Sequence, residues 1–161
     1  SQQQNQDVIR QVFGAQPPFN VNFIGHMPAN NVYNDYLNSG DIVIGMSGGE
    51  GWGLPEFQSV AMGKHSVMLD CNGYKSWANE SNSTMVKPNG KTDAADGIFF
   101  ANGGDHNQGS IFTFDEEEFL AGCETAIKKH KENKVNKEGL KLQEKFTVSN
   151  TFDTILEDLQ Q

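Results

Sequence analysis

A strand, a glycine-dense loop and a helix are predicted to follow one another over residues 42–63, and this order constrains the fold more than any other feature. The apolar run 42–46 predicts a compact strand. Pro55 suits the first turn of a helix, and Gly63 suits its exit. Because ligands collect at the carboxyl ends of strands in an open parallel sheet, the loop between the strand and the helix is the first candidate for a binding site.

The loop has the composition of a site for an anion or a nucleotide. Its glycines allow positive φ angles and a close approach of the backbone to a ligand, and they are Gly48, Gly49, Gly51 and Gly53. The start of the next helix offers unpaired N–H groups and a partial positive charge, which favour a phosphate. Glu50 would repel a phosphate, so it either accepts hydroxyl groups of a sugar or is an exposed loop acid without a role.

The neighbouring segments repeat the alternation of strand and helix. Residues 21–24 predict a strand, residues 28–39 an amphipathic helix, and residues 66–69 a further strand. Short apolar strands joined through helices indicate a parallel sheet covered by helices on both faces. The predicted fold class is therefore α/β, a Rossmann-like sheet in one domain over residues 1–161.

The ends of the chain and one insert complete the prediction. Residues 1–6 are expected to be disordered or the end of a truncated element, and a short helix is expected to end at Gly14. Residues 98–100 and 110–114 predict the two strands of a small β-hairpin insert. Asp115 predicts the N-cap of a helix. A last helix with apolar residues at i, i+3, i+4 and i+7 is expected to pack back on the core; these residues are Phe152, Ile155, Leu156 and Leu159.

Charge and composition exclude several classes of function. The formal net charge of −9 argues against nucleic acid or an acidic membrane as the general partner. Seven of the twelve Lys and Arg residues lie within 128–145, a run that predicts a solvated helix face, with polyanion binding as the alternative. Two distant cysteines, Cys71 and Cys123, give no metal-ligand pattern. No apolar run is long enough for a membrane span, and no signal peptide is recognisable, so the cytoplasm is the expected compartment.

The central segment resembles a known family. Residues 47–63 read Ser-Gly-Gly-Glu-Gly-Trp-Gly-Leu-Pro-Glu-Phe-Gln-Ser-Val-Ala-Met-Gly. This is similar to the donor-site signature Glu-Gly-Phe-Gly-Leu-Pro-x-x-Glu-Ala-Met-Ala-x-Gly of retaining, glycogen-synthase-like glycosyltransferases of the two-domain GT-B fold. The resemblance extends to residues 21–25, to residues 36–44 and to the end of the chain. It implies that the chain is the C-terminal, nucleotide-sugar-binding half of such an enzyme.

Carried over residue by residue, the resemblance implies a role for each part of the motif. Glu50 would be the catalytic-site carboxylate that accepts hydroxyls of the donor sugar. Gln58 stands where the family has a second acid, and it would bind the ribose as a neutral and weaker partner. Gly25 and His26 would contact the base. The residues implied to lie against the sugar and the diphosphate are Gly49, Gly51, Trp52, Gly53 and Leu54.

The resemblance also implies what a complete enzyme would need. The family's Arg and Lys that neutralise the leaving diphosphate find no counterpart, since nothing before Val8 matches and Arg10 occupies neither position. The expected partner is an N-terminal acceptor-binding domain or a separate chain, and the chain alone is expected to be inactive. The expected substrate is a UDP- or GDP-linked sugar, with no metal ion.

Two other classes of function stay open from the sequence. The first is a non-catalytic nucleotide- or sugar-binding module that kept the fold, a reading that Gln58 favours. The second is an interaction domain that binds a polyanion through residues 128–145. A different sugar-phosphate enzyme with a similar loop, such as an epimerase, is a more distant third.

Overall fold

The computed structural model describes residues 2–14, 17–95, 100–101 and 108–160. The chain divides into two compact units, Ser1–Tyr33 and Asn34–Gln161. Each unit is described by itself. Among the described residues, no helix has the length and apolar character needed to cross a bilayer.

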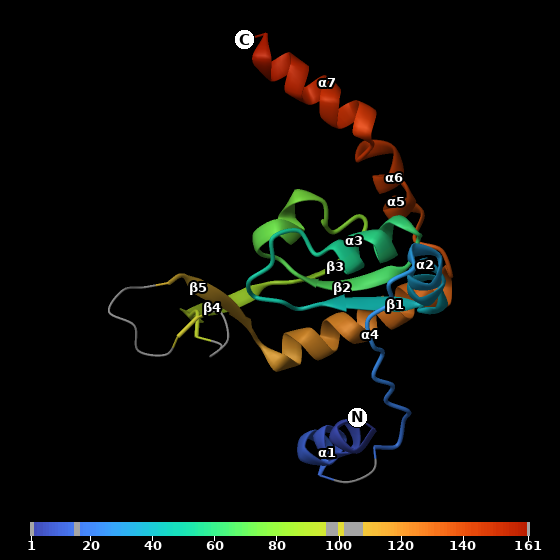
Figure 1. Ribbon diagram of the computed structural model, residues 1–161, viewed down its shortest axis with the longest axis vertical. Coiled ribbons are helices and arrows are strands. Elements are labelled where there is room, and N and C mark those ends of the chain that lie inside the picture. The colour runs from blue at the N-terminus through green and yellow to red at the C-terminus, as the bar shows by residue number, and fades with distance from the viewer. Residues whose placement is uncertain (1, 15–16, 96–99, 102–107, 161) are drawn as a thin grey trace. The chain divides into compact units, whose positions relative to one another are not determined.

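A three-stranded parallel sheet forms the centre of the Asn34–Gln161 unit (Figure 1). Its strands are β1 (Ile42–Gly45), β2 (His65–Leu69) and β3 (Thr84–Val86), in the order β1-β2-β3. Both neighbouring pairs are parallel. The predicted α/β class and the parallel sheet are therefore confirmed.

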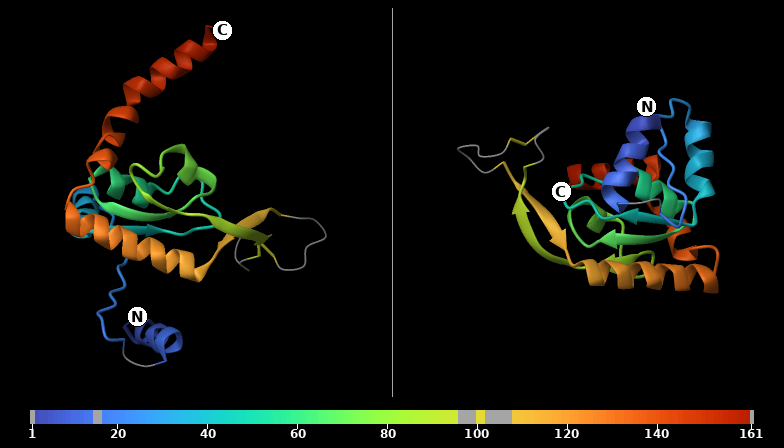
Figure 2. Two further views of the ribbon diagram at one scale, coloured as in Figure 1. Left: turned by 180° about the vertical axis from the view of Figure 1, so that it is seen from behind. Right: turned by 90° about the horizontal axis from the view of Figure 1, so that it is seen from below.

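Helices cover both faces of this sheet, as Figures 1 and 2 show for α3 (Leu54–Ala61) and α4 (Glu116–Glu132). Every residue of β2 is buried, so the strand supplies a core to each face. Met68 belongs to the cluster on the α3 side, together with buried residues of α3 and of the segment after β2. Val67 and Leu69 belong to the second cluster, with Ala126 of α4.

Three short helical segments connect the elements: η1 (Asn72–Ser76), α5 (Lys137–Leu140) and α6 (Leu142–Lys145). Buried Asn136 fixes the start of α5 because its side chain accepts a hydrogen bond from the Gly139 amide, 3.0 Å away. The Asn136 amide group also donates to the carbonyl oxygens of Lys64 (3.1 Å) and Asn82 (2.7 Å). One side chain thus joins α5 to the segments that precede β2 and β3.

An antiparallel hairpin of β4 (Pro88–Asp93) and β5 (Ser110–Phe114) follows the sheet. The second strand agrees with the predicted 110–114. The first does not, because β5 pairs with Pro88–Asp93 and not with the predicted 98–100, of which 98 and 99 lie outside the described residues. The strand β4 is polar and mostly exposed, so it lacks the apolar pattern by which a strand is predicted.

The last helix, α7 (Val148–Leu159), forms where the sequence predicts it. Its predicted packing is wrong: every residue of α7 is exposed, and its apolar residues are 49% exposed or more. The periodicity fixes the helical conformation and places the apolar residues on one side. It carries no information on which surface covers that side.

The Ser1–Tyr33 unit contains α1 (Gln2–Phe13), which ends at Gly14 with φ +67°. Residues 2–6, expected to be disordered or part of a truncated element, lie within this helix. The prediction of a strand at residues 21–24 is wrong: among the described residues, these positions have no strand partner and form no strand. The next helix, α2 (Asn30–Ser39), spans the boundary between the units.

Candidate functional site

The glycine-dense loop lies at the carboxyl edge of the parallel sheet. It occupies residues 46–53, between the end of β1 and the start of α3. The segment 70–77 leaves β2 at the same edge, because β1 and β2 run parallel. The sheet thus brings together two segments more than twenty residues apart in the sequence.

Residues of two other segments, 70–77 and β5, hold the loop in place through its backbone carbonyl groups. The Gly48 oxygen accepts hydrogen bonds from the Asn72 side-chain amide (2.6 Å) and from the Phe112 backbone (3.0 Å). The backbone carbonyl oxygen of Glu50 accepts a hydrogen bond from the Gly73 amide at 3.0 Å. The loop is therefore fixed before any ligand arrives, which reduces the entropy lost on binding.

The indole of Trp77 donates to the carbonyl oxygen of Trp52 at 2.8 Å. The ring of Trp52 packs edge-on against Phe57 and Phe146, with centroids 5.7 and 5.4 Å apart. Buried aromatic pairs of this kind add to the stabilisation from their area. The aromatic cluster thus attaches the end of the loop to α3 and to the segment after α6.

The glycines of the loop divide into two groups. Gly53 has φ +74°, and a Cβ there would overlap the ring of Tyr74; a Cβ on Gly48 would overlap the backbone of Phe112. These two positions require glycine for the fold. Gly51 has open space around it and Gly49 has a single neighbour at 3.9 Å, so both leave the backbone accessible from outside.

Glu50 is half-buried, and its carboxylate is anchored by its own loop. Oε1 accepts hydrogen bonds from the backbone N–H groups of Gly51 (3.0 Å) and Trp52 (3.4 Å). Within the described residues, Oε2 makes no hydrogen bond. The backbone amides of Gly51 and Trp52, which were expected to lie against the donor sugar, are therefore bound to the Glu50 carboxylate. These two hydrogen bonds fix the position of Oε2.

A second acid, Glu56, lies in the first turn of α3, and sequence reasoning gave it no role at the site. Its Oε2 and the hydroxyl of Tyr74 are buried and lack a hydrogen-bond partner among the described residues. Burial raises the pKa of Glu56 above its usual 4.5, and the negative charge of Glu50 adds to the increase. The sequence feature that could have identified Glu56 is its position three residues after the N-cap, where an acid is favoured at a helix start.

Tyr74 is fully buried in the cluster on the α3 side of the sheet. Burial raises the pKa of its hydroxyl, and the charges of Glu56 and Glu50 raise it further. Tyr74 therefore stays protonated and can donate a hydrogen bond. The loop rests on a buried hydroxyl and a buried carboxyl group, both of which retain hydrogen-bonding capacity.

The start of α3 has no side-chain cap. Its N-cap is Gly53, and no side chain accepts a hydrogen bond there. Leu54 is the first residue of the helix, so its backbone amide has no carbonyl acceptor four residues earlier within the helix. Leu54 is 60% exposed. Gln58, the predicted ribose ligand, lies one turn further along α3 and is half-buried.

The predicted base-binding residues and the loop belong to different units of the chain. Gly25 and His26 are exposed and belong to the Ser1–Tyr33 unit, whereas Glu50 belongs to the Asn34–Gln161 unit. The strand that was expected to end at these residues is not formed. Their role in binding the base therefore stays a prediction.

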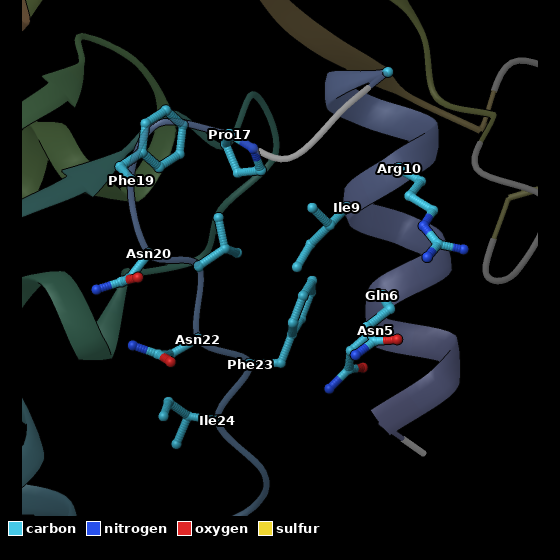
Figure 3. A pocket seen from close by; sticks show the side chains of 12 residues that line it. Asn5, Gln6, Ile9, Arg10, Pro17, Phe19, Asn20, Asn22, Phe23 and Ile24 are labelled. Carbon is cyan, nitrogen blue, oxygen red and sulfur yellow. The ribbon is translucent and has the colours of Figure 1, made fainter.

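Two cavities lie elsewhere, and Glu50 lines neither. A groove of about 850 Å³ within the first unit separates α1 from the extended residues 19–24, with Ile9 and Phe23 on facing sides (Figure 3). A small cavity of about 130 Å³ lies near the amino-terminal ends of β2 and β3, between His65 and Lys129. Among the described residues, no group of three His, Cys, Asp or Glu side chains is placed to hold a metal ion.

Comparisons of the chain with protein-family models, with curated proteins and with solved structures give no match. The resemblance to glycosyltransferases therefore rests on the sequence, chiefly on the motif over residues 47–63.

Proposed function

We propose that the chain is the donor-binding half of a retaining glycosyltransferase, in which loop 46–53 binds a nucleotide-diphosphate sugar. The observation that carries this proposal is the anchored carboxylate of Glu50, on a fixed loop beside the start of α3. A carboxylate accepts hydrogen bonds from sugar hydroxyls, and a helix start favours a phosphate. One loop thus offers a matching group to each half of an activated sugar.

The contacts of the loop suggest how the two tasks are divided. Oε1 of Glu50 stays bound to the amides of Gly51 and Trp52, and Oε2 accepts a sugar hydroxyl. The diphosphate then binds at the amide of Leu54, where the partial positive charge of α3 is concentrated. Exposed backbone at Gly49 and Gly51 lets the sugar approach without steric hindrance.

The remaining contacts of the proposal rest on the resemblance. Gln58 binds the ribose hydroxyls, and Gly25 and His26 contact the base. Transfer of the sugar, from a UDP- or GDP-linked donor in the cytoplasm, requires an acceptor-binding domain or a partner chain. We therefore expect the chain alone to bind the donor weakly and not to transfer the sugar.

A titration with UDP-glucose and with GDP-mannose tests the proposal. We expect weak, saturable changes in the backbone amide NMR signals of residues 49–54. Glu50→Gln keeps the shape of the side chain and removes its charge, so it should weaken binding at least about tenfold, as expected for one charged hydrogen bond. Glu132→Gln, at an exposed acid at the end of α4, is the matched control and should bind as the original chain does.

Three results would contradict the proposal. The first is the absence of any change in the loop signals with either nucleotide sugar at millimolar concentration. The second is equal binding by the original chain and Glu50→Gln. The third, a low-micromolar affinity of the chain alone, would leave the loop as a binding site but would refute the expectation that further diphosphate ligands are needed.

The pH dependence of binding gives a second test, because Glu56 has a raised pKa. The neutral form of Glu56 persists above pH 4.5. As the pH rises through the raised pKa, Glu56 ionises and the site gains a second negative charge beside that of Glu50. Donor binding should therefore weaken as the pH rises above the usual 4.5 and through the raised pKa of Glu56. The stability that the neutral form contributes is lost over the same interval. Glu56→Gln should remove both changes, and an unaltered pH profile in this variant would exclude Glu56 as their cause.

A further inference from the structure

Helix α7 lacks the contacts that normally stabilise a helix of its length. It has 12 residues, and an isolated helix of about this length is marginal in water. Thr147 caps its first turn, and the side-chain amide of Asn150 donates to the carbonyl oxygens of Glu144 (2.8 Å) and Lys145 (3.2 Å). These polar contacts join α7 to the end of α6 and bury none of its apolar side chains. A covering surface is therefore needed.

The exposed apolar side of α7 is broad and large. The exposed fractions are 76% for Val148, 62% for Phe152, 49% for Ile155, 52% for Leu156 and 78% for Leu159. This stripe is wider than the two-position seam of a coiled coil and matches a helix that packs on a folded surface.

The charges of α7 specify the chemistry of that surface. The helix carries Asp153, Glu157 and Asp158 and contains no Lys or Arg. A complementary surface must therefore combine exposed apolar groups with positive charge.

The chain itself carries such a surface in residues 128–145, which we call the lysine-rich segment. It holds seven lysines and three glutamates, whereas the whole chain has a net charge of −9. Val135 and Leu140 are 44% and 37% exposed, and both lie beside Gly63, so they form one apolar patch among the lysines. Lys131 precedes this patch in the sequence and Lys137 lies between its two residues, and both lysines are exposed.

We infer that α7 of one copy packs on the lysine-rich segment of a second copy, in a reciprocal exchange that forms a two-fold dimer. Within one copy, the contacts of α7 with this segment include the hydrogen bonds of Asn150 to Glu144 and Lys145, and they leave the apolar side of α7 exposed. A two-fold exchange makes the same contact twice. This inference is independent of the proposed function.

Sedimentation equilibrium of the full chain from about 1 to about 500 μM tests the inference, and we expect a concentration-dependent dimer. Two charge-reversed variants sharpen it. The acid-reversed variant carries Asp153→Lys and Glu157→Lys, and the lysine-reversed variant carries Lys131→Glu and Lys137→Glu. Each variant alone should dimerise at least about tenfold more weakly, because like charges then meet in both contacts.

A mixture of the two variants is the decisive arm. In a reciprocal dimer of the two variants, the reversed surfaces meet in one contact and the original surfaces meet in the other, so opposite charges meet in both contacts and the mixture should form a heterodimer. Phe152→Asp, in an exposed position of α7, should yield a monomer whose thermal midpoint equals that of the original chain diluted below its dimerisation range, which shows that it still folds.

Four results would overturn the inference. A monomer at every concentration would exclude the dimer, and a dimer that is insensitive to the lysine reversals would indicate α7–α7 pairing. A monomer in which the amides of α7 are protected from hydrogen exchange would indicate folding onto the same copy. Failure of the mixed variants to associate, when the original chain does dimerise, would exclude the lysine-rich segment as the partner of α7.

Discussion

Helices α4 and α7 share an amphipathic pattern and a side-chain N-cap, and they differ in what covers them. Asp115 caps α4 by accepting hydrogen bonds from the amides of Glu117 and Glu118, and Thr147 caps α7 in a similar way. The fully buried positions of α4 hold small and polar residues, and Phe119 and Cys123 pack beside them; the fully buried positions are Gly122, Ala126 and His130. The larger apolar residues of α7 are all exposed.

The difference shows that shape decides packing as much as hydrophobicity does. A Cβ on Gly122 would lie 3.0 Å from Val86 and 3.2 Å from Val67, so α4 lies close to the sheet because these side chains are small. Close packing over the sheet then excludes water from both surfaces. The apolar residues of α7 stay exposed instead, because no described part of the same copy is packed against them.

The largest effect is expected when a charge is placed on the apolar side of each helix, because that side is covered in α4 and exposed in α7. Ala126 is completely buried, so Ala126→Asp should lower the free energy of unfolding by several kcal/mol, because it buries an unpaired carboxylate. Leu156→Asp on α7 is the matched change and should alter monomer stability by less than about 0.5 kcal/mol. Urea denaturation at low micromolar concentration measures both. Comparable losses in the two variants would mean that α7 is covered within its own copy.

The next effect concerns the reactivity of thiols on the two helices. Burial raises the pKa of Cys123 on α4 above its usual 9.0, so its reactive thiolate forms only at higher pH. Burial also raises the pKa of Cys71, the second thiol of the chain. In Ile155→Cys, the new thiol on α7 is exposed, and we expect it to react with iodoacetamide at about pH 8 at least about tenfold faster than either natural cysteine.

Mass spectrometry of the alkylated peptides gives the three rates separately in one sample. The experiment should use a protein concentration at which the chain is monomeric, because the inferred dimer would cover residue 155. Slow alkylation of the new thiol under those conditions would contradict the exposure of α7.

The contrast between local helical pattern and covering surface in α4 and α7 also explains how much of the fold could be predicted. The strands β1 and β2 and the helices α3, α4 and α7 follow from local patterns, since apolar runs, caps and 3.6-residue periodicity are properties of short segments. The strand expected at 21–24 and the pairing expected for the hairpin failed, because strands depend on partners that lie elsewhere in the chain. The polar strand β4 is defined by its pairing with β5.

The candidate site divides in the same way. The position of Glu50 in a loop at the carboxyl edge of the sheet follows from the order of strand, glycines and helix. Its anchoring by its own loop amides, the support of the loop by Asn72 and Gly73, and the burial of Glu56 beside Tyr74 depend on the conformation of the loop and on contacts across the sheet edge. No local pattern encodes such contacts.

The smallest effects are expected from removing the two caps. Asp115→Ala leaves the amides of Glu117 and Glu118 without their acceptor, and it should lower the free energy of unfolding by about 1 kcal/mol because α4 is part of the core. Thr147→Ala removes the acceptor for the Asn150 amide, but α7 contributes no buried side chain, so global stability should stay within about 0.3 kcal/mol. Hydrogen exchange should instead show faster exchange of the α7 amides alone. Asp115→Asn and Thr147→Ser, which keep an acceptor oxygen, should behave as the original chain does, and a global loss in Thr147→Ala equal to that in Asp115→Ala would show that the two helices belong to one cooperative unit.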